Sequence, residues 1–495
     1  MSIPPDQATT AALLERLAGA APVETHISAV FLGTDTVWKL RKAVKLAFVD
    51  FTSLAERERT ARRELELNQA NAPGMYRDVV PVTRASDGTL ALDGPRGSAG
   101  EAIDWVVRMA RVPAADFLDE VAARGGLTPA LLDGLGDEVA ALHARIPPVP
   151  RDQAAALRDV AAGNALAARQ AGLPPGDVAR WQAGMDTLLD RHAASLRARG
   201  TAGFVRRCHG DLHLGNMCLW QGAPVAFDAL EFDENLATVD IGYDLAFLLM
   251  DLDVRVGRAA ANRVMNRYLA RTGDWALVAF LPIFLSMRAM VRAHVEAARG
   301  RTADSRGYLD RALEYQRPQP ACVVAIGGLP GSGKSTVARA LAPGLGPAPG
   351  AVILRSDEIR KRRSGVPPEQ RLPKSAYSSR VSAAVFAEIA AASGAIAAAG
   401  HAVVADATFM DPAHRAALQA AAASAAPFLG TWLEVPMAEL ERRVAARTGD
   451  ASDADLAVLR SAARAGAGAG TWLALDGTNT DRAVATIRAT LAIRP

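Results

Sequence analysis

The stretch "GGLPGSGKST", residues 327–336, constrains the fold more than any other part of this 495-residue chain. It satisfies the pattern G-x-x-x-x-G-K-[ST] in full, and it stands between the apolar run "ACVVAIG" and the helix-forming run "STVARALA". A strand, a glycine-rich turn and a helix in this order wrap backbone N–H groups around phosphate oxygens, and the helix N-terminus adds a favourable dipole. The sequence therefore predicts a nucleotide-binding loop in an α/β domain.

The polar residues of this loop have expected roles. The ammonium of Lys334 should neutralise the outer phosphates, and the hydroxyl of Ser335 should hold Mg²⁺. The predicted nucleotide-contacting residues are Gly328, Gly331, Ser332, Gly333, Lys334, Ser335 and Thr336. ATP and Mg²⁺ are therefore the expected cofactors.

Residues 318–495 alternate between short apolar runs and helical segments. The runs "CVVAIGG", "AVILRSD", "HAVVADAT" and "FLGTWLEV" favour a parallel sheet. Ligands bind at the carboxyl ends of parallel strands, so Asp357 and Asp406, which follow the second and third runs, should face the loop. Asp357 is the predicted base that accepts the proton of an attacking hydroxyl. Arg447 is the predicted cation over the transferred phosphoryl group, with Arg443 as the other candidate.

These segments resemble a known group of enzymes. "GGLPGSGKST", "SDEIRK", "DATF" and "RxxxRxGDASDADL" look like the small P-loop kinases related to polynucleotide kinase, gluconate kinase and zeta toxin. The resemblance covers about 170 residues, estimated from the motif positions. It implies a kinase and not a simple ATPase, and it does not name the acceptor.

A second pattern, "CHGDLHLGNMC" at residues 208–218, points to phosphoryl transfer of another type. A protein-kinase-like site needs an Asp for the acceptor hydroxyl, an Asn a short loop away for Mg²⁺, and a second Asp for the metal. Asp211 and Asn216 have the first spacing, and Asp228 follows the strand-like run "VAF". His209 is expected to brace the loop.

The stretches "HGDLHLGN", "FDALEFD" and "DIGYDLAFL" resemble the aminoglycoside phosphotransferase and choline kinase group. The resemblance implies that Asp211 is the catalytic base and that Asn216 and Asp228 are Mg²⁺ ligands. Residues 27–50 read as a hairpin, in which Lys39 and Arg41 share one face of a strand. Lys39 is the predicted phosphate contact.

Glu64, on the following helical segment, is the predicted partner of Lys39. No G-x-G-x-x-G is present, and the hairpin turn has the single glycine Gly33, so ATP binding in this region is left open. Residues 105–112 would form the hinge, with Met109 as a candidate contact for the adenine.

The expected fold class is an α+β, protein-kinase-like bilobal domain followed by an α/β P-loop NTPase domain with a parallel sheet. The first domain spans 1–317, with a small lobe of about 1–110 and a helical large lobe of about 111–317. The second spans 318–495, because two prolines interrupt the helical pattern in "EYQRPQPA". The whole resembles fusions of an aminoglycoside phosphotransferase-like domain with a P-loop kinase domain.

The composition disfavours other classes. A net charge of +3 gives no reason to expect a large nucleic-acid footprint, and three cysteines without metal-ligand spacing favour a reducing cytosol. No signal peptide is visible at the N-terminus. The apolar run 275–291 contains Pro282 and Arg288, so it reads as a buried core helix and not as a membrane span. The expected location is cytoplasmic, without a membrane partner.

Three functions remain open. The favoured one is a bifunctional kinase in which each domain phosphorylates a hydroxyl of a small molecule. In the second, the N-terminal domain is a regulatory or substrate-binding pseudokinase and only the P-loop domain is catalytic. In the third, the P-loop domain is a 5′-hydroxyl polynucleotide kinase, an alternative that the basic stretch "RKRRSG" at 360–365 keeps open.

Overall fold

The computed structural model describes residues 2–46, 49–92, 100–447, 449–466 and 468–493 of the chain. The chain forms two compact units, one of residues 1–151 and 200–244, the other of residues 152–199 and 245–495. This division by contacts groups the helices after residue 245 with the C-terminal residues. The predicted domain boundary at residues 317 and 318 stays a prediction.

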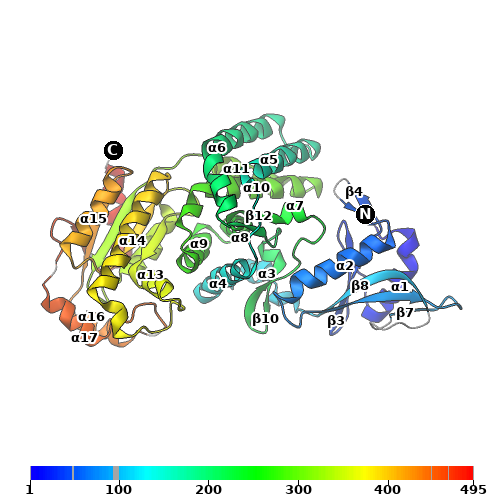
Figure 1. Ribbon diagram of the computed structural model, residues 1–495, viewed down its shortest axis with the longest axis horizontal. Helices are drawn as coiled ribbons and strands as arrows, with labels where there is room; N and C mark the ends of the chain where they lie inside the picture. The colour runs from blue at the N-terminus through cyan, green and yellow to red at the C-terminus, as the bar shows by residue number, and fades with distance from the viewer. Residues whose placement is uncertain (1, 47–48, 93–99, 448, 467, 494–495) are drawn as a thin grey trace. The chain divides into compact units, whose positions relative to one another are not determined.

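The first unit begins with an antiparallel sheet between two helices. The strand order is β1 (Val23–Glu24), β2 (Ser28–Leu32), β3 (Thr36–Arg41), β8 (Glu101–Ala110), β6 (Tyr76–Arg84) and β7 (Leu90–Leu92). Successive residues of a strand point to opposite faces, so Val106 packs with α1 (Ala8–Ala18) while Val107 packs with α2 (Leu54–Gln69). Figure 1 shows α2 lying along this sheet.

Two short antiparallel pairs carry the loops that matter for function. The first pairs β10 (Met217–Trp220) with β11 (Ala223–Ala226), and its two turn residues have positive φ, as a tight hairpin turn requires. The second pairs β9 (Val205–Arg207) with β12 (Thr238–Asp240). The pattern that begins at His209 therefore joins β9 to β10, and Asp228 follows β11. The helices of this part are α3 (Leu118–Ala123), α4 (Pro129–Arg145) and α7 (Glu234–Ala237).

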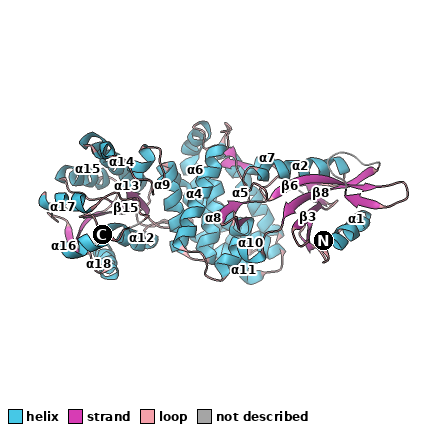
Figure 2. Cartoon of the chain, turned by 90° about the horizontal axis from the view of Figure 1, so that it is seen from below, coloured by secondary structure: helices cyan, strands magenta, loops and turns pink. Residues whose placement is uncertain are grey.

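The second unit contains a group of long helices, drawn in cyan in Figure 2. They are α5 (Gln153–Gln170), α6 (Pro175–Thr201), α8 (Ile241–Arg255), α9 (Arg258–Thr272), α10 (Leu281–Ala298) and α11 (Thr302–Glu314). The apolar run 275–291 forms the 3₁₀ helix η4 (Trp275–Phe280) and much of α10, with Pro282 in the first turn, where its missing N–H does no harm. The run is mostly buried, as predicted for a core helix.

Two stretches, Trp275–Ala298 and Ser379–Ala398, are long and apolar enough to cross a membrane by length and composition alone. The first is 72% buried inside the protein. Core helices of soluble proteins pass the same test, so these stretches are weak evidence for a membrane span. The absence of a membrane partner stays a prediction.

The C-terminal residues form the predicted parallel sheet. Its strand order is β14 (Val352–Arg355), β15 (Val403–Asp406), β13 (Val323–Gly328), β16 (Phe428–Glu434) and β17 (Leu473–Asp476). The fifth strand, β17, was not among the predicted runs. The chain leaves β13 toward β14 on one side and later adds β16 on the other, so the strand order reverses at β13. Ligands bind at such a reversal, and the glycine-rich loop follows β13.

Helices cover this sheet, and most of them follow a strand directly. They are α12 (Lys334–Leu341), α13 (Ser356–Arg363), α14 (Ser379–Ala398), α15 (Pro412–Ala423), α16 (Met437–Ala445), α17 (Leu456–Arg464) and α18 (Thr480–Ile493). One buried core joins Val324 and Val404 of the sheet to Leu341 of α12 and Ile487 of α18. The expected fold class is therefore confirmed in both parts of the chain.

Candidate phosphoryl-transfer sites

The glycine-rich loop between β13 and α12 has a backbone that only glycine adopts readily. Gly328, Gly331 and Gly333 have φ values of 145°, 84° and 89°. A Cβ on Gly328 would lie 2.6 Å from the Ser332 hydroxyl oxygen, so a side chain there would also clash with Ser332. The turn between β13 and α12 therefore has the glycine-dependent backbone that the sequence predicts, and its binding of a nucleotide stays a prediction.

Lys334 lies across this loop. Its Nζ donates to the Leu329 carbonyl oxygen at 2.9 Å and to the Ser332 Oγ at 3.4 Å. Burial lowers the pKa of Lys334 to about 8, and the nearby carboxylates of Asp406 and Asp357 only partly oppose that shift. Both of its hydrogen-bond partners are uncharged. A hydrogen bond to an anionic phosphate would therefore stabilise the ammonium more strongly than its present contacts do.

Ser335 and Asp406 form a pair of oxygen donors that fits Mg²⁺. The Ser335 hydroxyl donates to Oδ2 of Asp406, which ends β15, at 2.5 Å. Hydroxyl and carboxylate oxygens are the donors that Mg²⁺ prefers, so these residues fit the ion. Arg355 approaches the same carboxylate, with its Nε 3.5 Å from Oδ2 of Asp406.

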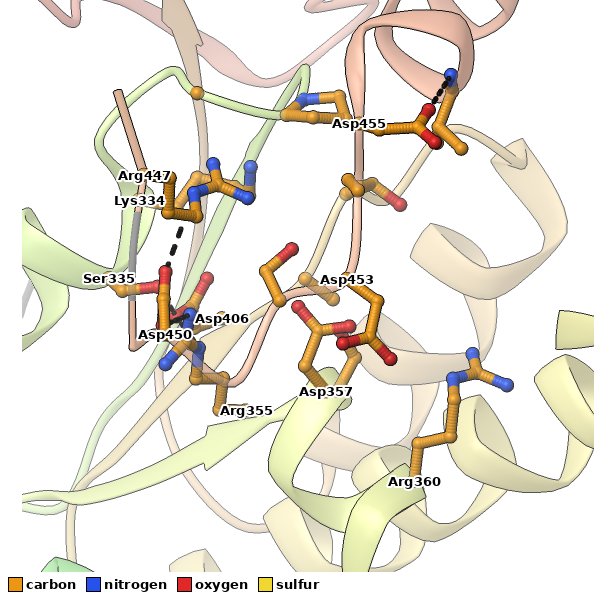
Figure 3. A pocket seen from close by; sticks show the side chains of 18 of the residues that line it. Lys334, Ser335, Arg355, Asp357, Arg360, Asp406, Arg447, Asp450, Asp453 and Asp455 are labelled. Atoms are coloured by element: carbon orange, nitrogen blue, oxygen red, sulfur yellow. Dashed lines mark hydrogen bonds and ion pairs between the residues drawn. The ribbon is translucent and has the colours of Figure 1, made fainter. Parts of the chain in front are cut away.

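One cavity of about 1000 Å³ joins these groups to the predicted base Asp357. Figure 3 shows Lys334, Ser335, Asp406 and Asp357 around the same space. Burial raises the pKa of the Asp357 carboxyl, Arg355 opposes that shift, and Asp406 adds to it. A raised pKa makes this carboxylate a stronger base once it is ionised.

The two candidate cations for the transferred phosphoryl group, Arg443 and Arg447, also line the cavity. Arg443 donates to the carbonyl oxygens of Gly477 at 3.1 Å and Gly331 at 3.4 Å. Arg447 has its Nε 3.7 Å from Oδ2 of Asp450, and its Nη1 is buried without a hydrogen-bond partner in the part of the chain that the structure describes. Arg447 is thus the better placed of the two to take up a new anion.

Sequence reasoning missed Asp450 and Asp453, two aspartates that connect the segment after α16 to the rest of this site. Asp450 accepts from Arg355 Nη2 at 2.7 Å. Asp453 pairs with the buried Lys361 at 2.8 Å and accepts from the Tyr377 hydroxyl at 2.6 Å. The run "DASDAD" was a visible signal, but these partners are 76 to 95 residues away in the sequence.

The basic stretch 360–365 is occupied by internal contacts. Lys361 pairs with Asp453, and Arg362 and Arg363 both pair with Glu388. Arg360 is buried over the Tyr377 ring, 4.7 Å from its centroid. The carboxylates of Asp453 and Glu388 offset part of the charge of this stretch, which reduces what it offers to a nucleic-acid backbone.

In the N-terminal unit, the predicted base and its metal partner lie together. Asn216 Nδ2 donates to Oδ2 of Asp211 at 2.9 Å and to its carbonyl oxygen at 3.0 Å. Asn216 also accepts the backbone N–H of Phe227 at 3.0 Å, which brings it next to Asp228. The amide oxygen of Asn216 and the carboxylates fit Mg²⁺ as ligands.

His209 braces the loop, as predicted. It is buried, burial lowers its pKa, and its Nε2 lies 2.9 Å from the Phe227 carbonyl oxygen. Asp244, which sequence reasoning did not single out for this task, accepts the backbone N–H groups of His209 at 3.2 Å and Gly210 at 2.8 Å. The buried carboxylate of Asp244 therefore fixes the backbone that leads into Asp211.

Lys39 and Glu64 form the predicted pair, at 2.7 Å. Lys39 also contacts Oδ1 of Asp228 at 2.5 Å. Burial disfavours the charge of Lys39, but Asp228 and Glu64 outweigh burial and raise its pKa above the ordinary value. The phosphate cation predicted from the sequence is thus held by two carboxylates, one of them the predicted metal ligand.

Arg41 is a functional candidate that the sequence placed on the right face but left unassigned. Its Nη2 donates to Oε2 of Glu64 at 2.8 Å, and it pairs with Glu231 as well. The side chains of Arg41 and Glu231 are 4% and 5% exposed. Glu64 therefore bridges two cations of β3.

Asp228 has a left-handed backbone, with φ of 60°, and the small lobe holds it there. Its N–H donates to the Tyr76 hydroxyl at 3.1 Å, and the N–H of Ala229 donates to Oδ1 of Asn68 at 2.9 Å. The segment that carries the predicted metal ligand Asp228 is consequently tied to α2 and β6 by its own backbone.

The turn between β2 and β3 is tight around its single glycine, Gly33. A Cβ on Gly33 would lie 2.7 Å from the Trp38 ring, so this glycine makes room for a tryptophan. Met109 pairs with Val37 on β3 and packs against the core of the sheet. Its contact with adenine stays a prediction.

Comparison with known proteins agrees with this geometry. The sequence pattern of the phosphotransferase enzyme family matches residues 25–281, more than half of the chain. The chain belongs to that family. An AAA domain pattern matches residues 323–468, so the phosphotransferase domain is followed by a P-loop kinase domain, as the resemblance indicated.

An uncharacterized protein of Mycobacterium tuberculosis is 29% identical over 451 residues, which is 87% of each chain. Two solved structures are similar to single parts. A choline/ethanolamine kinase family protein from Mesorhizobium loti covers 63% of this chain and 99% of its own, with 16% identity and a TM-score of 0.37. A gluconokinase from Sinorhizobium meliloti covers 36% and 99%, with 21% identity and a TM-score of 0.26.

Proposed function

We propose that this protein is an ATP-dependent kinase with two phosphoryl-transfer sites, each of which phosphorylates a hydroxyl of a small molecule. The observation that carries the proposal is the single cavity that holds Lys334, the Ser335–Asp406 pair and Asp357. Family membership gives kinase-like domains in both parts of the chain. The acceptors and the bifunctional character belong to the proposal.

At the P-loop site, the backbone of the loop and Lys334 bind the outer phosphates of ATP. Ser335 and Asp406 would hold Mg²⁺, which neutralises charge on the phosphates. Asp357 takes the proton as the acceptor oxygen bonds to the γ-phosphorus, and the bond from the γ-phosphorus to the β–γ bridging oxygen breaks to release ADP. Arg447 stabilises the charge on the transferred group.

At the N-terminal site, Asp211 takes the acceptor proton, and Asn216 and Asp228 would hold Mg²⁺. Lys39, which pairs with Asp228 in this structure, would contact the phosphates with Asp228 directed to the metal. The favouring observation is that Asp211, Asn216 and Asp228 are brought together by one hairpin and its flanking loops. A domain without chemistry has no physical need for all three.

The regulatory alternative rests on a specific observation, the tight Gly33 turn in place of a glycine-rich phosphate loop. In that case the N-terminal domain binds a regulator or a substrate, and only the P-loop site transfers phosphate. The polynucleotide kinase alternative loses support, since Lys361, Arg362 and Arg363 are paired with carboxylates of the same protein and Arg360 is buried. With its three free cysteines, two of them buried, the chain is proposed to be cytoplasmic.

The test is transfer of labelled phosphate from ATP to a panel of small alcohols, sugars and aminoalcohols. Asp357→Asn and Asp211→Asn should each remove a different set of products, with a loss of about 10²- to 10⁴-fold for a positioned base. Asp78→Asn, in an ion pair with Arg108 on the small-lobe sheet, is the control. Unchanged products in Asp357→Asn would refute the P-loop assignment, and loss of all products in Asp357→Asn alone would favour the regulatory alternative.

A further inference from the structure

Strand β14 is an edge strand of the parallel sheet, and it leads directly into the P-loop cavity. It pairs on one side with β15, where Val352 donates to the Ala402 carbonyl oxygen at 2.9 Å. Because successive residues alternate direction, the C=O of Ala351 and the N–H of Ile353 point away from β15. Such edge groups need another partner when they are not in water.

Helix α9 supplies that partner with two asparagine side chains one helical turn apart. Asn266 Oδ1 accepts the N–H of Ile353 at 2.7 Å, and its Nδ2 donates to the Ala351 carbonyl oxygen at 3.2 Å. Asn262, which is 2% exposed, donates from Nδ2 to the same carbonyl at 3.0 Å. The amide of Asn266 thus contacts β14 as the backbone of a neighbouring strand would.

Asn266 is itself held in place. Its Nδ2 also donates to Oδ1 of Asn262 at 3.0 Å and to the Asn262 carbonyl oxygen at 3.0 Å. Helix α9 therefore holds the edge strand through a hydrogen-bonded pair of asparagines. The adjacent Arg267 contacts Glu369, which follows α13 and is not on the strand.

The strand that α9 grips carries two groups of the P-loop site. Ile353 is two residues before Arg355, which pairs with Asp450 and approaches Asp406. It is four residues before Asp357, the predicted base in the first turn of α13. Figure 3 shows Arg355 and Asp357 entering the cavity from this strand and helix. A shift of β14 would move both groups relative to the loop that holds Lys334.

We propose that Asn266, braced by Asn262, is a positioning residue for phosphoryl transfer at the P-loop site. It holds the edge strand in the register that places Arg355 and Asp357. Residues 262 and 266 lie within the stretch matched by the phosphotransferase family, and β14 lies within the AAA domain match. The P-loop site therefore depends on a helix outside its own domain. This inference rests on the proposed function for its catalytic consequence.

The experiment uses the full chain with Asn266→Ala, Asn266→Asp and the control Arg258→Ala. Arg258 begins the same helix but pairs loosely with Glu314, at 3.7 Å. Hydrogen exchange at the Ile353 amide is measured first. Loss of one hydrogen bond should speed that exchange by roughly fivefold to tenfold in Asn266→Ala, less in Asn266→Asp, which keeps an acceptor, and not at all in the control.

The second readout is Mg·ATP hydrolysis that depends on Lys334, taken as the difference from the Lys334→Ala rate. The loop lies on β13 and α12, so KM for ATP should hold while kcat falls by roughly fivefold in Asn266→Ala. If Asn266→Ala does not fold, the same comparison is made with Asn266→Asp.

Exchange and kcat at the wild-type level in a folded variant would overturn the inference. A roughly fivefold rise in KM for ATP at constant kcat in Asn266→Ala would also overturn the positioning role, because the effect would then be on binding. If the wild-type chain shows no Lys334-dependent binding of ATP, the proposed function fails, whereas the exchange rate at Ile353 still decides whether Asn266 pairs with the strand.

Discussion

The two candidate sites present their phosphate cations in opposite ways. Lys334 rests on uncharged oxygens, and burial lowers its pKa to about 8. Lys39 rests on the carboxylates of Glu64 and Asp228, which raise its pKa despite burial. In the proposed function, the ammonium at the P-loop site would gain a counter-ion from ATP, whereas at the N-terminal site the Asp228 carboxylate would first have to move away from Lys39.

This difference follows from how each site is built. The P-loop site is made by a continuous stretch of backbone, so its phosphate cradle needs no ion pairs. The N-terminal site is assembled from β3, α2 and the Asp228 segment, and it holds two cations against three carboxylates before any ligand binds. Mg²⁺ on Asp228 would relieve Lys39, so metal and nucleotide should bind this site together.

The largest expected effect in this comparison is on stability. Arg41→Ala should leave Glu231 buried without its cation and lower the free energy of unfolding of the N-terminal unit by about 3–5 kcal/mol. Arg59→Ala removes an exposed pair with Glu56 and should cost at most about 1 kcal/mol. Urea unfolding followed by circular dichroism measures both. Equal effects of the two variants would mean that the ion network does not assemble this site.

The next effect concerns pH. Above pH 8 the free Lys334 loses its proton, and ATP requires the charged form, so affinity at the P-loop site should fall by about tenfold between pH 7 and pH 9. Lys39, with its raised pKa, should keep its charge over this range. Calorimetric titration with Mg·ATP measures the dependence. Lys334→Arg is the control, because a guanidinium does not titrate there; an unchanged pH dependence in that variant would assign the proton to another group.

Short sequence patterns predicted the secondary structure and most of the candidate site residues, whereas most contacts between distant segments were not predicted. The glycine-rich loop, the parallel sheet and the Lys39–Glu64 pair follow from residues whose roles depend on near neighbours or on a single expected partner. The choice of Lys39 over Arg41 was incomplete, because both side chains of that strand face reach Glu64. Strand alternation puts Lys39 and Arg41 on the same face, and it cannot decide which of the two contacts the phosphates.

Contacts between residues far apart in the sequence could not be predicted from the sequence. Asp453 meets Lys361 across 92 residues, and Asn266 meets Ile353 across 87. Neither pair has a spacing that signals it. Strand β17 was missed because four residues, "LALD", follow a run rich in Ala and Gly that carries no periodic pattern. Its place in the sheet comes from pairing with β16.

The central claim is that both sites hold nucleotide, and the stoichiometry of ATP binding with Mg²⁺ tests it most directly. Calorimetry on the whole chain and on Lys334→Ala is the measurement, with thermal unfolding of both proteins to show that the variant is folded. The account predicts two sites in the whole chain and one in the variant. One site in the whole chain and none in the variant would contradict it, and the N-terminal domain would then be a regulatory or substrate-binding module.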